Sequence, residues 1–148
     1  MPRVKASMKD ISTDYSPIEP GVHRYEIKDV TEHEDENTNR IHYAIKSEVI
    51  EVMDGGDEKD VGRTITDRVH IHLRDGGLNE FGLAQLKRYF EVTVGEEQAN
   101  DDEADTDWLI NQQFLGQTTI ESYEVKDNLT GQKETRKRNN LTRLAPIS

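Results

Sequence analysis

Residues 63–73, R-T-I-T-D-R-V-H-I-H-L, alternate between apolar and polar side chains. Because successive side chains of a strand point to opposite faces, the pattern predicts a half-buried β-strand with a basic, hydroxyl-rich outer face. Asp67 interrupts the apolar side, which indicates either a β-bulge or a buried carboxylate that requires a partner. The two sides of this strand hold, respectively, Ile65, Val69, Ile71 and Leu73, and Thr64, Thr66, Arg68, His70 and His72.

Two further strands are predicted before this one, over residues 21–31 and 40–52, with a polar turn between them. In the first, Val30 falls out of phase with Tyr25 and Ile27, and a bulge near Lys28 would restore the alternation. The loop that follows the second strand contains a Gly-Gly pair, which suits the positive φ angles of a hairpin.

After the strand at 63–73 the spacing of apolar residues changes to that of a helix over residues 78–90. Gly82 lies on the apolar face of this helix and permits close approach to a sheet. Residues 108–115 predict one or two helical turns, and residues 116–126 and 140–146 predict a fourth strand and a short fifth strand.

The predicted order is therefore three strands, a helix and two strands. Strands joined by short turns pair as an antiparallel meander, and a small sheet of this kind buries its edges by closing. We expect a mainly β fold, a five-stranded antiparallel OB-type barrel with the helix between strands three and four. A split sandwich with a docked helix is the competing arrangement. The domain organisation expected for 148 residues is an N-terminal arm, 1–20, and a single domain, 21–146.

Charge is distributed unevenly along the chain. Thirty acidic and nineteen basic residues give a net charge of −11, and seven of the acids lie in residues 96–107, which contain no base. We expect this segment to be an exposed acidic loop, so that a basic surface can exist elsewhere. The most basic stretch, 132–139, is expected to form the loop after the fourth strand.

Composition also excludes several kinds of chemistry. There is no cysteine, and therefore no disulfide, thiolate metal site or cysteine nucleophile. The first residues contain no apolar run typical of a signal peptide, and no window is long enough for a membrane-spanning helix, so we expect a cytoplasmic protein without membrane contact. His70 and His72 could ligate a metal, but no third ligand is evident and a solvent-exposed pair is the preferred interpretation. We expect no catalytic residues, no metal and no cofactor.

Several strings resemble a known family. They are Y-S-P-I-E-P-G-V-H-R-Y-E-I-K-D-V, I-H-Y-A-I-K-S-E-V-I-E-V, V-G-R-T-I-T-D-R-V, L-A-Q-L-K-R-Y-F, F-L-G-Q-T-T-I-E-S-Y and N-N-L-T-R-L. In strand spacing and placement of glycines, residues 15–146 resemble bacteriophage single-stranded-DNA-binding proteins of the OB type, many of which are catalogued as domains of unknown function. The long acidic insert, and Val22-His23 where an aromatic residue is common, depart from that family. The resemblance implies a non-catalytic role in phage DNA replication or recombination, in the cytoplasm of a bacterial host.

The OB-type barrel binds its ligand on the outer face of strands two and three, between the loops after strands one and four. Lysine and arginine there would neutralise phosphates, and aromatic rings would stack on bases. Tyr15 and Tyr43 are further aromatic candidates, although Tyr43 falls on the predicted core face. The predicted nucleic-acid-binding residues are His42, Lys46, Arg68, His70, His72, Tyr123, Lys133, Arg136, Lys137 and Arg138.

The acidic segment 96–107 suggests a second class of function. It could compete with DNA for the basic groove, or recruit phage or host replication and recombination proteins. It could also be a solubilising loop. The alternative to DNA binding is a protein-interaction or DNA-mimic module that acts through its acidic surface.

Overall fold

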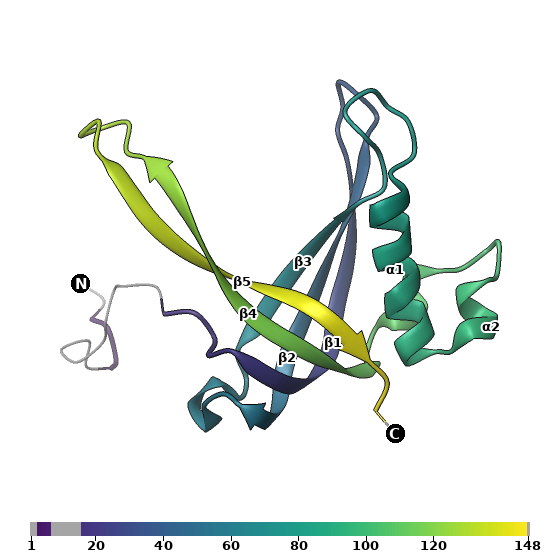
Figure 1. Cartoon of the computed structure of the whole chain (residues 1–148), viewed down its shortest axis with the longest axis horizontal. Helices are drawn as coiled ribbons and strands as arrows, with labels where there is room; N and C mark the ends of the chain where they lie inside the picture. The colour runs from purple at the N-terminus through teal and green to yellow at the C-terminus, as the bar shows by residue number, and fades with distance from the viewer. Residues whose placement is uncertain (1–2, 7–15, 148) are drawn as a thin grey trace.

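In the part of the chain that the structure describes, five antiparallel strands form a single sheet in the order β3-β2-β1-β4-β5 (Figure 1). The computed structural model describes residues 3–6 and 16–147. The prediction of a mainly β chain with one main helix between the third and fourth strands is confirmed. The split sandwich is wrong, because the strands belong to one sheet. The strands are β1 Gly21–Glu34, β2 Ile41–Gly55, β3 Thr64–His70, β4 Gln113–Lys126 and β5 Lys133–Ala145.

A bulge in β1 brings its apolar residues into phase. The β1–β2 register skips Lys28, because Ile27 lies opposite Ser47 and Asp29 lies opposite Lys46. One extra residue reverses the face on which the following side chains lie. Val30 therefore returns to the core side and packs against the core, as the sequence predicted.

The main helix, α1 Glu80–Thr93, packs against the inner face of the sheet. Tyr25 of β1 stacks on Phe114 of β4 with ring centroids 5.5 Å apart, and Tyr89 of the helix meets Phe114 edge-on at 5.5 Å. Gly82 permits this packing, because a Cβ atom there would lie 1.8 Å from the carbonyl oxygen of His70. The helix contacts the sheet at Gly82, which has no side chain. It begins two residues later than predicted.

The acidic segment 96–107 is more structured than the loop we predicted. It contains a short helix, α2 Glu96–Ala99, and the start of a 3₁₀ turn, η2 Thr106–Leu109. Another 3₁₀ turn, η1 Glu58–Asp60, lies between β2 and β3. All seven acidic side chains of the segment are exposed, whereas Ala99 packs against the core. The chain therefore anchors this segment by its apolar residues and leaves its carboxylates in solvent.

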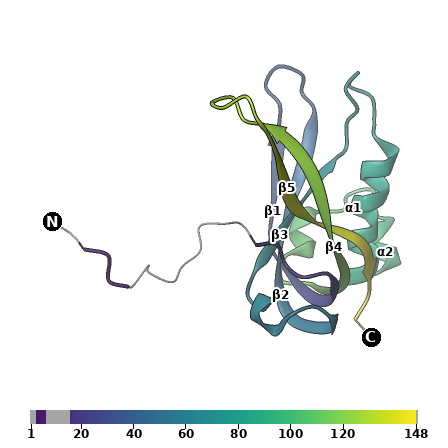
Figure 2. The ribbon, with the colours of Figure 1, turned by 60° about the vertical axis from the view of Figure 1, so that its left-hand side comes forward.

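Strands β4 and β5 leave the sheet as a long two-stranded arm (Figures 1 and 2). β4 pairs with β1 only from Gln113 to Thr118, whereas its pairing with β5 continues to Lys126. The predicted basic loop 132–139 is wrong, because nearly all of it lies within β5. Alternation of apolar residues could not reveal this, since the strands of the arm pair with each other and have solvent on both faces.

The sheet is not closed by hydrogen bonds. β3 and β5 are its two edges, and no ladder joins them in the part of the chain that the structure describes. A cleft of about 800 Å³ lies between α1 and β5, lined by Asp67, Arg88 and Arg143. Arg88 crosses this gap and donates a hydrogen bond of 3.1 Å to the carbonyl oxygen of Leu144. Among the described residues, no helix is both long and apolar enough to cross a membrane.

Candidate nucleic-acid interface

The outer face of β2 and β3 holds the cations that the sequence predicted there. His42 lies opposite His70. Lys46 lies opposite Thr66, which is two residues before Arg68 on the same face of β3. Lys46, Thr64, Thr66, Arg68 and His70 are exposed and His42 is half-buried. Within the described residues, neither Lys46 nor Arg68 forms an ion pair. Both charges are therefore free to bind an anionic ligand.

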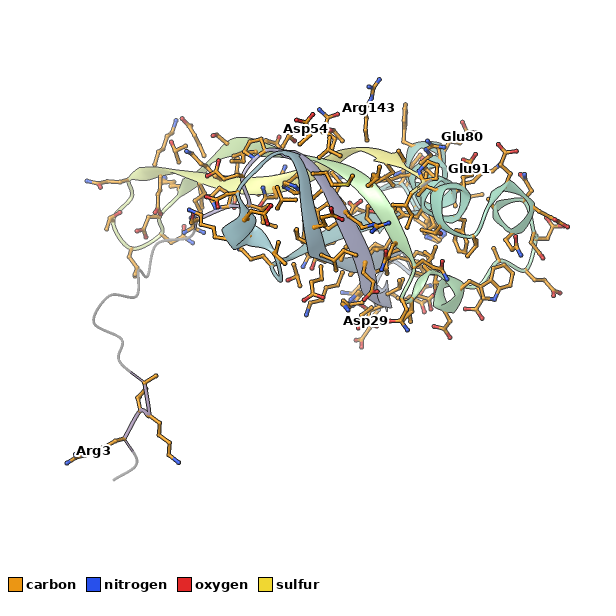
Figure 3. All side chains as sticks on the ribbon, turned by 90° about the horizontal axis from the view of Figure 1, so that it is seen from below. Arg3, Asp29, Asp54, Glu80, Glu91 and Arg143 are labelled. Carbon is orange, nitrogen blue, oxygen red and sulfur yellow. The ribbon has the colours of Figure 1, made fainter. Side chains whose placement is uncertain are left out.

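One acidic group of the neighbouring strand β1, Glu26, is neutralised by an ion pair with Lys28. Lys28 lies between Glu26 and Glu48, with its Nζ atom 3.2 Å from the Glu48 carboxylate. The pKa of the Glu26 carboxyl is held below its usual range, first of all by the hydrogen bond from Lys28. Asp29 lies opposite Lys46 in the β1–β2 register, and Figure 3 shows its side chain at the far side of the molecule from Arg143. Among the described residues, the cations of this face without an ion pair are thus Lys46 on β2 and Arg68 on β3, and Lys46 has the Asp29 carboxylate as its neighbour on β1.

Three histidines form a row across β1, β2 and β3, which we call the histidine row: His33, His42 and His70. The His33 and His42 rings are stacked, with centroids 4.9 Å apart and planes at 15°. The His42 and His70 rings are also 4.9 Å apart, with planes at 38°. This spacing matches the separation of neighbouring strands, about 4.8 Å. The sequence analysis missed His33 because it ended the first strand at residue 31, whereas β1 continues to Glu34.

His72 lies beyond the end of β3, which stops at His70 rather than at Leu73 as predicted. It forms an isolated bridge with Leu78. Its Nδ1 atom accepts a hydrogen bond of 2.9 Å from the backbone N–H of Ile41. An acceptor nitrogen carries no proton, so this hydrogen bond fixes the tautomer of the ring and ties the end of β3 to the start of β2.

Two clefts adjoin this face and meet at His70. The first, about 380 Å³, lies at the β1–β2 turn and is lined by the histidine row, His72 and Arg40. The second, about 490 Å³, lies between β3 and β5 and is lined by Thr66, Arg68, His70 and Arg138. A path along the surface therefore leads from Arg138 on the arm, past Arg68, to the histidine row.

The residue that interrupted the predicted strand is a partly buried carboxylate, and β3 has no bulge there. Asp67 accepts hydrogen bonds of 2.7 Å from both the Tyr89 hydroxyl and the Gln85 amide of α1. Burial raises the pKa of Asp67, although both hydrogen bonds act to lower it. The Tyr89 pKa is raised well above its ordinary value, first by burial and then by the Asp67 charge. Asp67 thus attaches the helix to the inner face of β3, behind the proposed interface.

The basic residues of the arm are divided between its two faces. Tyr123 lies opposite Arg136, and the Arg138 guanidinium lies 5.2 Å from the Tyr123 ring centroid. Lys133 and Lys137 lie on the opposite face, because side chains alternate along β5. The prediction of one basic loop is therefore corrected, since Arg138 lines the cleft and the two lysines point to the other side of the arm.

Ion pairs reduce the positive charge of the arm unevenly. Arg138 lies 2.9 Å from the Glu121 carboxylate, and Arg136 lies 3.4 Å from that of Glu134. In the part of the chain that the structure describes, Lys133 and Lys137 have no such partner. All these side chains are exposed, so each pair is weak and a phosphate can replace the carboxylate at little cost.

Of the remaining aromatic candidates, Tyr43 is among the described residues. The Tyr43 hydroxyl donates a 2.8 Å hydrogen bond to Glu32, and burial together with this bond raises the Tyr43 pKa to about 12. Tyr43 is half-buried and lies opposite Val69, on the core side of the sheet as the sequence predicted. Tyr15 and most of the N-terminal arm fall outside the described residues. At the end of that segment, the Ile18 backbone exchanges hydrogen bonds of 2.9 and 2.8 Å with the Asn139 side chain.

Comparison with known proteins assigns no family. No protein-family model matches the chain, and no curated protein matches it. Among residues 3–6 and 16–147, no group of three or more histidines and carboxylates has the arrangement of a metal site. The interpretation of the surface therefore rests on its own geometry.

Proposed function

We propose that this chain is an OB-type protein that binds single-stranded DNA without catalysis, on the outer face of β2 and β3. The strand order and the position of α1 between β3 and β4 support this assignment. They are those of the five-stranded, partly open OB barrel, which binds oligonucleotides at the same face. The resemblance to phage proteins in strand spacing supports a role in replication or recombination inside a bacterial host.

The observation that carries the proposal is the cleft shared by Arg68 and Arg138. Arg68 is an exposed cation on β3 that forms no ion pair within the described residues, and Arg138 belongs to the arm formed by β4 and β5. A chain of phosphates that follows this cleft would contact both guanidinium groups and then reach the histidine row. Tyr123, which is 37% exposed on the same face of the arm as Arg138, supplies a ring for base stacking.

Fluorescence anisotropy of a labelled ~30-nucleotide poly-dT strand tests this function, with a duplex of equal length as the control. We expect tighter binding to the single strand. The logarithm of affinity should fall linearly with the logarithm of salt concentration, by about 0.7 per phosphate neutralised. Absence of binding at low salt would reject the proposal.

The acidic segment supports a second candidate function, the binding of a basic protein partner. Its seven carboxylates are exposed, and none forms an ion pair within the described residues. In Figure 1 the short helix of this segment lies on the other side of the sheet from the tip of the arm. Replacing Asp101, Asp102, Glu103 and Asp105 with their amides tests this role. Deleting the segment would also remove Ala99 from the core and so confuse two effects.

In this second function the acidic segment would recruit a phage or host replication protein, or the whole chain would mimic the charge of DNA. The amide variant should then lose the partner. Under the DNA-binding proposal the same variant should bind poly-dT as well as, or more tightly than, the unaltered protein, because the overall charge becomes less negative.

A further inference from the structure

The histidine row presents imidazoles to solvent at both ends. β4 pairs with β1 only over Gly21–Glu26, so at His33 the side of β1 away from β2 has no strand partner among the described residues. His70 lies on β3, which is an edge of the sheet. His33 and His70 are exposed, and His42 between them is half-buried. A ligand that enters the cleft at the β1–β2 turn can therefore reach all three rings.

The surroundings of the row disfavour positive charge in the free protein. Burial lowers the pKa of His42, and the adjacent His70, His33 and Arg68 lower it further. Rings 4.9 Å apart cannot all be protonated without strong mutual repulsion. The neutral form of His42 is therefore favoured when nothing is bound to the row.

Charged groups of both signs surround this cleft. Arg40 and Arg68 are cationic, and Glu34 and Asp35 are the carboxylates that line the cleft. One oxygen of Asp35 accepts hydrogen bonds from the backbone N–H groups of Asn37 (2.9 Å) and Thr38 (3.2 Å) within the turn. These bonds lower the pKa of Asp35, which thus stabilises the turn in its ionised form.

We propose that the histidine row binds a backbone phosphate of single-stranded DNA in its protonated form, so that DNA binding takes up protons from solvent. This inference rests on the proposed function. A phosphate in the cleft would lie between Arg40 and the row. Each imidazole that gains a proton becomes a cation with two N–H donors instead of one. The proton passes from the buffer acid to a ring nitrogen, where a new N–H bond forms, and no other covalent bond changes.

The direction of the pH effect follows from linkage. A nearby anion favours the charged form of histidine and raises its pKa in the complex above that of the free protein. Binding then takes up protons wherever the pH lies between those two values. Affinity should therefore rise as the pH falls from about 8 to about 6, by up to about tenfold per pH unit for each proton taken up.

The first experiment measures poly-dT affinity across this pH range at constant ionic strength. We expect affinity to rise at least about fivefold from about pH 8 to about pH 6, and calorimetry in two buffers of different ionisation enthalpy to show net proton uptake. The combined variant His33→Gln, His42→Gln and His70→Gln should bind with little dependence on pH.

Two control variants separate the row from other charges. Lys133→Gln removes a cation on the far side of the arm that has no ion pair among the described residues, and it should leave the pH dependence unchanged. Asp67→Asn removes a carboxyl group near the path whose pKa is raised by burial, and it should also retain the dependence. If Asp67→Asn abolishes the pH dependence, the histidine row is not its source and the inference is wrong.

A second measurement does not depend on any variant. Proton NMR of the imidazole rings gives the pKa of His42 with and without poly-dT, and we expect the pKa to rise on binding. Binding with no change in this pKa, or with no dependence on pH, would overturn the inference and leave the proposed function standing. Absence of binding at every pH would overturn the proposed function itself.

Discussion

The Tyr89 hydroxyl of α1 donates a 2.7 Å hydrogen bond to the carboxylate of Asp67 on β3. This bond joins the main helix to an edge strand of the sheet, directly behind the surface that carries Arg68. It also accounts for an acidic residue on the apolar side of a strand, because the helix supplies the partners that a buried carboxylate requires. The position of the proposed interface thus depends on a polar contact inside the protein.

Tyr89→Phe should destabilise the protein, because Asp67 would then keep only the hydrogen bond from Gln85. We expect a loss of about 1–3 kcal/mol in the free energy of unfolding, measured by urea denaturation at neutral pH. Tyr43→Phe is the matched control, since the Tyr43 hydroxyl bonds a carboxylate at the solvent-exposed side. An equal loss in the two variants would show that burial of Asp67 is not the cause.

Asp67 should also make stability depend on pH. Its pKa is higher in the folded than in the unfolded protein, so the folded state holds the proton more tightly. The stability contributed by this group is present at low pH and is lost as the pH rises from about 4 through the raised pKa. Asp67→Asn removes this effect. Relative to the unaltered protein, the variant should gain stability as the pH rises through that range, and a constant difference would contradict the assignment.

Gly82→Ala should destabilise the fold by about 3 kcal/mol or more, because its Cβ atom would overlap the His70 carbonyl oxygen and separate α1 from β3. Gly77→Ala is the control, since its Cβ atom would meet only the flexible Asp75 side chain, at 3.1 Å. Thermal unfolding of the two variants provides the comparison. A Gly82 variant as stable as the Gly77 variant would mean that the helix does not require this close approach.

Arg68→Gln should weaken single-stranded DNA binding and reduce the slope of its salt dependence by about 0.7, the contribution of one phosphate contact. Arg143→Gln is the control, because Arg143 is exposed (Figure 3) and lines the cleft beside α1 instead of the two clefts of the proposed path. Equal effects of the two substitutions would indicate a general response to net charge and would argue against the path.

Tyr123→Ala should weaken poly-dT binding by about 1–3 kcal/mol if a base stacks on the ring. Leu129→Ala, at the exposed tip of the same arm, removes a large apolar side chain without removing an aromatic ring. The two variants are compared by fluorescence anisotropy under the same salt conditions. If Tyr123→Ala binds as the unaltered protein does, the arm contributes through charge alone.

The local pattern of apolar and polar residues was sufficient to predict the elements that have one face in the core. The alternation around Ile65 and Val69 predicted β3, and the helical spacing around Tyr89 and Phe90 predicted α1, because burial of one face imposes a period on the sequence. The bulge at Lys28 was also predicted, since the residue after it had to return to the core. These features can be predicted from residues that lie close together in the sequence.

Contacts between distant segments decided the rest. The arm has no buried face, so nothing in the periodicity of residues 132–139 distinguished a strand from a loop. The alternation of residues 63–73, together with the net charge of −11, was enough to predict a basic strand face within an acidic protein. Only the strand register brought His33 beside His42 and His70, and only the sheet order brought Arg138 to the cleft of Arg68, because pairing across strands depends on which residues meet in space.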